Sequence, residues 1–109
     1  FVAAKITFDS GDVGLYEAVW NRPGPWAVTV SAPERRWEMR PLEQAAYQEA
    51  GQRKMAGVEP HPWDVQFKPG LRLQAEKAVA ATRGEVVDLP TLQESLKVMR
   101  LVRDIYTPR

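Results

Sequence analysis

The residues best suited to binding chemistry stand in one short segment, Pro60-His61-Pro62-Trp63, just before a predicted helix. His61 is the only histidine of the chain, and Trp63 adds a large aromatic ring next to it. The prolines on both sides of His61 restrict the backbone, so this segment can present a side chain to a ligand at little entropic cost. A polar group beside an apolar wall is typical of a ligand-binding site. The alternative interpretation is a surface loop with one packed ring.

The residue patterns that perform most catalysis are absent. The chain has no cysteine, which excludes disulfides, thiolate metal sites and cysteine nucleophiles. A single histidine excludes the His-x-x-x-His zinc pattern, and a metal site built from His61, Glu59 and Asp64 is disfavoured. No serine stands at a strand-to-helix elbow, and no glycine-rich turn leads into a helix as a phosphate loop requires. We therefore predict no catalytic, cofactor-binding or metal-binding residue in this chain.

Two pairs of carboxylates resemble the acid–base pairs of hydrolases, namely Glu34 with Glu38 and Glu43 with Glu49. Three arginines stand near them in the sequence: Arg35, Arg36 and Arg40. Carboxylates beside arginines on a sheet usually form solvated ion pairs. We therefore expect ion pairs here and no acid–base catalysis.

Composition restricts the class of protein further. The 109 residues carry 15 Lys or Arg against 14 Asp or Glu, a formal net charge of +1. No basic stripe is available to neutralise a run of phosphates, which argues against a nucleic-acid partner. No apolar run approaches the about 20 residues that cross a bilayer, and no signal-peptide pattern opens the chain. We expect a globular, cytoplasmic protein with no membrane partner. Because the chain begins at Phe1 and enters a strand-like pattern at once, we interpret it as a piece of a longer protein.

Alternation of apolar and polar residues predicts strands in the first half of the chain. The expected strands cover residues 2–9, 13–21, 26–31 and 35–40, with a fifth strand or a short helix over 42–47. Turns are expected at Ser10-Gly11-Asp12 and at Arg22-Pro23-Gly24-Pro25. Residues 51–62 are polar and are expected to be irregular.

The periodicity then becomes helical. One helix is predicted from 71 to 82, after Pro69 and before Gly84. A second begins at the capping box formed by Thr91 and Glu94 and is stopped by Pro108. Strands followed by helices predict an α+β fold: a mostly antiparallel sheet of about five strands, with two C-terminal helices covering one face. We predict that residues 1–109 form one domain.

The second expected strand is apolar on both sides. Tyr16 and Trp20 alternate with Val13 and Leu15, and two short helices can cover only one side of a sheet. An open apolar sheet face usually marks a partner surface. The alternative is that a further part of the same protein covers it.

The order of short motifs along the chain adds a more specific interpretation. The first half contains Phe8-Asp9-Ser10-Gly11-Asp12-Val13-Gly14, Trp20, Pro23-Gly24-Pro25-Trp26 and Pro41-Leu42-Glu43. The second half contains Asp64-Val65-Gln66-Phe67-Lys68-Pro69-Gly70, Gln74, Arg83-Gly84, Leu89-Pro90-Thr91-Leu92, Ser95-Leu96, Met99 and the run from Leu101 to Tyr106. This order resembles the C-terminal domain of the glucose–fructose oxidoreductase / inositol dehydrogenase (Gfo/Idh/MocA) family. The resemblance spans essentially the whole chain.

The resemblance implies a domain of an enzyme rather than a complete enzyme. Members of that family carry an N-terminal Rossmann domain that binds NAD or NADP and, with the start of the second domain, holds the catalytic residues. Nothing in this chain matches those residues, so the resemblance implies an inactive part of an NAD(P)-dependent oxidoreductase that binds no cofactor itself. The parent would act on a secondary alcohol of a sugar, cyclitol or nucleotide-sugar.

The same resemblance implies partners and a place for the substrate. The partners would be the protein's own Rossmann domain and a second copy, bound through the sheet face. In the family the stretch before the penultimate helix lies near the substrate, so His61 and Trp63 are expected to line the pocket for a polyol or sugar. The alternative hypothesis is a stand-alone dimerisation or small-ligand binding module without catalysis.

Overall fold

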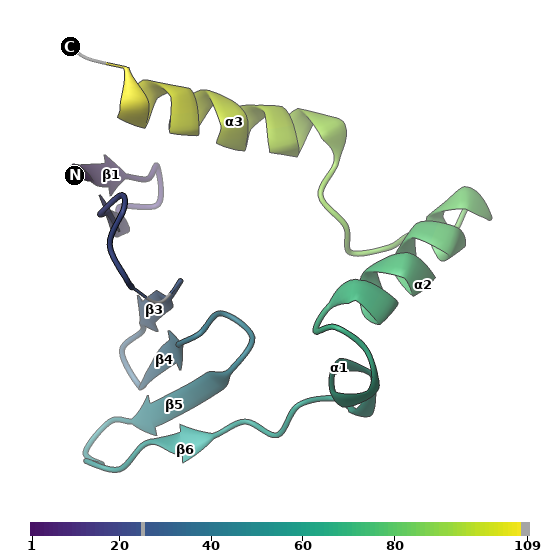
Figure 1. The fold of residues 1–109 in the computed structure, drawn as a ribbon, viewed down its shortest axis with the longest axis horizontal. Helices are drawn as coiled ribbons and strands as arrows, with labels where there is room; N and C mark the ends of the chain where they lie inside the picture. Colours follow the sequence, from purple (N-terminus) through teal and green to yellow (C-terminus); the bar gives the residue numbers. More distant parts are fainter. Residues whose placement is uncertain (25, 108–109) are drawn as a thin grey trace. The chain divides into compact units, whose positions relative to one another are not determined.

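The structure is a computed structural model that describes residues 1–24 and 26–107. The chain divides into two compact units, whose helices and strands are labelled in Figure 1. Unit 1 consists of Phe1–Gly24 and Pro90–Arg109, and unit 2 of Pro25–Leu89. Two predictions fall on residues outside the described ones. These are Pro25, predicted to lie in a turn, and Pro108, predicted to stop the last helix.

Unit 1 combines a β-hairpin with the last helix. Strands β1 (Val2–Thr7) and β2 (Val13–Ala18) pair antiparallel. The turn between them contains Gly11 at a φ of 89°, a left-handed conformation that glycine adopts without steric cost. The Phe8 N–H closes this turn by donating to the Asp12 carbonyl at 3.0 Å. The predicted hairpin and its turn are therefore confirmed.

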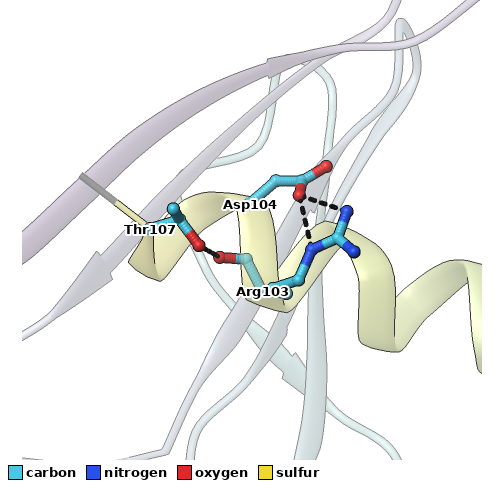
Figure 2. Close-up of polar contacts among 3 residues, drawn as sticks. All are labelled: Arg103, Asp104 and Thr107. Carbon is cyan, nitrogen blue, oxygen red and sulfur yellow. Dashed lines mark hydrogen bonds and ion pairs between the residues drawn. The ribbon is translucent and has the colours of Figure 1, made fainter. Parts of the chain in front are cut away.

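Helix α3 (Leu92–Tyr106) contacts β1. Its predicted capping box is present, because the Glu94 N–H donates to the Thr91 hydroxyl at 3.2 Å and the Thr91 N–H donates to the Glu94 carboxylate at 2.8 Å. Figure 2 shows the other end of the helix, where the Thr107 hydroxyl donates to the Arg103 carbonyl at 2.7 Å. The Arg103 guanidinium donates to one carboxylate oxygen of Asp104 at 2.8 and 2.9 Å. At the N-terminus the Thr91 hydroxyl thus supplies the acceptor that the Glu94 N–H lacks within the helix, and at the C-terminus the Arg103 carbonyl accepts from both the hydroxyl and the backbone N–H of Thr107.

The hairpin is covered on one side only. Its less exposed side carries Val2, Ala4, Ile6, Gly14, Tyr16 and Ala18. The opposite side carries Lys5 beside Leu15, a residue that is 84% exposed. Tyr16 thus lies on the half-buried side and Leu15 on the open one.

Unit 2 contains a four-stranded antiparallel sheet in the order β3-β4-β5-β6 (Figure 1). The strands are β3 (Val28–Ser31), β4 (Arg35–Met39), β5 (Ala45–Glu49) and β6 (Ala56–Gly57). Residues directly opposite each other in a sheet share a face. The register therefore separates an apolar face, which we call the Trp37 face, from a polar face. The Trp37 face carries Val28, Val30, Trp37, Met39, Ala45, Tyr47 and Ala56, together with Arg35 and Glu49.

Two helices complete unit 2. The short α1 (Pro62–Gln66) and the longer α2 (Leu71–Thr82) contact each other. Helix α2 ends as predicted before Gly84, which has a φ of 83° and donates its N–H to the Ala81 carbonyl at 3.0 Å. Within the described part of unit 2, neither helix contacts the four-stranded sheet.

The predicted α+β class is confirmed, and the strands pair antiparallel as expected. The prediction of one sheet of about five strands covered by two helices is wrong in its detail. The chain forms a two-stranded and a four-stranded sheet, and α1 is an additional helix. The backbone hydrogen bonding of the first sheet does not continue after β2. There Asn21 takes a φ of 60°, a left-handed conformation, and Pro23 has no N–H to donate to a neighbouring strand. That all 109 residues form one domain stays a prediction.

Strand and helix boundaries also differ from the prediction. The fifth expected strand begins at Ala45, because Pro41 to Gln44 form a turn closed by the Gln44 N–H donating to the Pro41 carbonyl at 2.9 Å. Residues 51–62 were expected to be irregular, but residues 56–57 within them form β6, and α1 begins at Pro62 and extends to Gln66. None of the described residues is fully buried, so the apolar side chains of both units keep solvent-exposed surface. No helix in the described residues has the length and apolar character to span a membrane.

Candidate functional site

His61 occupies the residue that caps the N-terminus of α1. Its backbone is extended, with φ −63° and ψ 144°, and Pro62 follows at the first helical position, where a missing N–H costs nothing. The Nδ1 atom of His61 accepts a hydrogen bond from the Trp63 N–H at 3.1 Å. The His61 carbonyl accepts from the Asp64 N–H at 2.8 Å. His61 is therefore held by its backbone and by its ring.

The structure brings His61 and Trp63 together, as the sequence predicts. Their ring centroids lie 5.0 Å apart with an interplanar angle of 66°, an edge-to-face contact. The imidazole is exposed and the indole is half-buried. The pair thus forms a polar group against an aromatic wall. That it binds substrate stays a prediction.

Two further residues join this pair. The Cζ atom of Arg72, in the first turn of α2, lies 5.4 Å from the centroid of the Trp63 ring and 5.7 Å from that of Phe67. These distances are within the range of a cation–π contact. Arg72 also pairs with Glu76, one helical turn further on, at 2.6 Å. We call His61, Trp63, Phe67 and Arg72 the His61 cluster.

A turn between the two helices positions Arg72. Gly70 takes a φ of 81°, and its N–H donates to Oδ1 of Asp64 at 2.9 Å. This bond ties the start of α2 back to α1 and places Arg72 over the rings. Arg72 and Phe67 were not among the predicted site residues. The available signal was Pro69-Gly70, a turn dipeptide between two helical segments.

The Asp64 carboxylate beside His61 takes part in the turn between α1 and α2. Among the described residues, no group of three or more His, Asp or Glu side chains is placed to hold a metal ion. The Asp64 carboxylate is instead engaged by the Gly70 N–H. In the His61 cluster, Trp63 is half-buried and the other three residues are exposed. Two shallow hollows lie elsewhere, one over β1 and β2 and one beside the β3–β4 turn, and neither includes His61 or Trp63.

A second cluster of aromatic side chains lies in unit 1. The phenol oxygens of Tyr16 and Tyr106 are 2.6 Å apart, and their rings meet edge to face at 6.2 Å. Trp20 meets the Tyr106 ring at the same distance, although Trp20 is still 63% exposed. The hydrogen bond with Tyr106 raises the pKa of Tyr16, with smaller contributions from desolvation and from the Tyr106 charge. Tyr16 therefore contacts α3, and the open side of β2 carries Leu15.

A third cluster lies on the Trp37 face. The Cζ atom of Arg35 lies 4.3 Å from the Tyr47 ring centroid and 5.2 Å from that of Trp37. The same guanidinium forms an ion pair with Glu49, directly opposite it in the register. The hydrogen bond to Glu49 raises the pKa of Arg35, and burial opposes this shift. The predicted ion pairing near the carboxylates is thus present for Glu49.

Comparison with known proteins assigns the chain to no family. No family model matches the chain, and no curated protein or solved structure matches it.

Proposed function

We propose that this chain is the C-terminal domain of an NAD(P)-dependent oxidoreductase similar to the Gfo/Idh/MocA family. The parent enzyme would transfer hydride between a nicotinamide and a secondary alcohol of a sugar, cyclitol or nucleotide-sugar. This domain would supply part of the wall of the substrate pocket and an interface between copies. The observation that carries the proposal is the shared order of motifs along the chain.

Several motif residues have structural roles that explain why their type matters. Gly11 takes a φ of 89° in the hairpin turn. At Gly14, a Cβ atom would come within 3.3 Å of the Phe8 ring, so a larger residue would crowd that aromatic side chain. Gly84 terminates α2 at a φ of 83°, and Tyr106 joins the end of α3 to β2. These roles explain why glycine and tyrosine suit these positions of the motifs.

We propose that this chain itself does not bind the nicotinamide cofactor. A pyrophosphate is bound by a glycine-rich turn at the start of a helix. Gly11 lies between two strands, and Gly70 begins α2 in a turn that Asp64 closes with its carboxylate. The proposal therefore places NAD or NADP and the catalytic residues in a Rossmann domain, and gives this chain no step of hydride transfer. It also places the enzyme in the cytoplasm, in keeping with the absence of cysteine.

The geometry supports two contributions of this domain. The His61 cluster offers an N–H donor beside an aromatic wall, which suits the hydroxyl groups and apolar ring faces of a sugar or polyol. The Trp37 face offers an apolar sheet surface, with Val28 and Val30 about half exposed at 44% and 49%. Such a surface favours association with a second copy. The same observation favours the second candidate function, a stand-alone dimerisation module.

Two measurements test the proposal together. One is the sequence upstream of Phe1, and the other is the dehydrogenase activity of the parent protein. We expect a strand followed by Gly-x-Gly-x-x-Gly upstream, and a parent protein that reduces NAD or NADP with a member of a sugar and cyclitol panel. The 109-residue chain is the matched control and should bind neither NADH nor NADPH in a calorimetric titration. A start codon just upstream of Phe1, or saturable NADH binding at low micromolar concentration by this chain, would contradict the proposal.

A further inference from the structure

The hydrogen bond at the start of α1 determines where the His61 ring carries its proton. The Trp63 backbone N–H donates to Nδ1 of His61 at 3.1 Å. A backbone amide can only donate, so Nδ1 must present its lone pair. In the neutral ring the proton is therefore on Nε2.

We infer that His61 binds a ligand as a hydrogen-bond donor through Nε2–H, and that the ligand atom it contacts is an oxygen of a sugar or polyol. This inference rests on the proposed function. With Nδ1 engaged and Nε2 protonated, the ring has no free lone pair with which to take a proton. His61 is thus a positioning residue and cannot act as a general base while the cap is in place.

The surroundings of His61 suit this ligand class. The Trp63 ring, 5.0 Å away, provides an apolar surface for the C–H face of a sugar ring. The Arg72 guanidinium is already paired with Glu76, and the Asp64 carboxylate keeps its negative charge while it accepts from the Gly70 N–H. An anionic ligand is therefore disfavoured, and a neutral hydroxyl oxygen suits the Nε2–H donor. The imidazole is exposed, so Nε2–H is accessible.

The tautomer can be measured directly on this chain. Because His61 is the only histidine, a long-range proton–nitrogen NMR correlation spectrum contains one imidazole pattern. At a pH where the ring is neutral, we expect the pattern of a protonated Nε2 and an unprotonated Nδ1. A ring that is mainly protonated on Nδ1 would overturn the inference.

Two isosteric variants separate the cap from the donor in the parent oxidoreductase. His61→Asn places an amide oxygen near the position of Nδ1 and so retains the cap, but it has no donor at Nε2. His61→Gln places an amide N–H near the position of Nε2 and loses the cap. Loss of one neutral hydrogen bond corresponds to an increase in KM of about twofold to tenfold.

We expect His61→Asn to raise KM by that factor with kcat unchanged, and His61→Gln to restore most of the affinity while lowering the Tm. A wild-type KM in His61→Asn would overturn the donor role. A loss of kcat in His61→Asn, with a changed pH profile, would indicate a proton-transfer role instead. A parent inactive with every sugar and cyclitol would overturn the proposed function and the ligand assignment together, whereas the NMR measurement decides the tautomer independently.

Discussion

The phenol oxygens of Tyr16 and Tyr106 lie 2.6 Å apart, although 90 residues separate them in the chain. Tyr16 is on β2, and Tyr106 is the last residue of α3. This hydrogen bond and the Trp20–Tyr106 ring contact join the hairpin to the helix. Unit 1 is therefore held together by contacts between the two ends of the sequence.

The stability of unit 1 should fall at alkaline pH because of this pair. The hydrogen bond with Tyr106 raises the pKa of Tyr16, so the folded state favours the protonated phenol. A raised pKa contributes stability that is complete below the ordinary tyrosine pKa of about 10 and is lost as the pH rises through the raised value. The urea midpoint, measured below and above that pH, should fall in the wild type and much less in Tyr16→Phe.

Tyr47→Phe is the matched control, because Tyr47 lies in unit 2 on β5. This variant should keep the alkaline fall of the wild type. Equal pH dependence in Tyr16→Phe and the wild type would contradict a stabilising role for the phenol pair.

The capping box of α3 should raise the free energy of unfolding by a measurable amount. In Thr91→Ala the Glu94 N–H loses its acceptor, and replacing an N-cap threonine by alanine costs about 1 kcal/mol. Urea denaturation should show this loss as a lower midpoint with an unchanged slope. Thr91→Ser retains the hydroxyl and should remain close to the wild type. An equal loss in both variants would mean that the hydroxyl bond is not the cause.

The elements that the sequence predicts well have strong local signals. Apolar alternation and the Gly11 turn predict the hairpin, and the Thr91–Glu94 capping box predicts the start of α3. The split into two sheets was not predictable, because alternation shows that a segment is a strand but not which strand it pairs with. Strand β6 has two residues and α1 has five, too few to show a period.

The candidate site was predictable only where its residues are close together in the sequence. His61 and Trp63 are adjacent because their separation in sequence is short. The cap on Nδ1 was not expected, since histidine is not among the preferred N-cap residues. Arg72 reaches the Trp63 ring only because Gly70 takes a left-handed conformation and bonds to Asp64. That arrangement depends on a turn geometry that residue types alone do not specify.

Arg35 should stabilise the four-stranded sheet more than its neighbour does. Its guanidinium contacts the rings of Tyr47 and Trp37 and pairs with Glu49. A lysine cannot reproduce the planar stacking, so Arg35→Lys should lower the urea midpoint. Arg36→Lys is the matched control, because Arg36 lies opposite Gln48 on the polar face. If both variants lost the same stability, the ring contacts would contribute nothing specific.

The last prediction concerns association through a sheet face. The open side of the hairpin is a poor interface, because Leu15 has Lys5 opposite it and Glu17 beyond it on the same side. The Trp37 face is more apolar, and Val28 and Val30 leave about half of their surface exposed there. Burying these side chains against a second copy is favourable in proportion to the apolar area removed from water.

Light scattering over a concentration series should therefore detect a dimer or a larger assembly of the wild-type chain. Val30→Lys should shift it to the monomer, because an unpaired ammonium group is costly to remove from water. Thr29→Lys is a matched control: it adds the same charge one residue away on the same strand, but on the polar face. It should leave the association unchanged. A wild-type monomer at the highest concentration, or equal dissociation in the two variants, would show that the Trp37 face is not the interface.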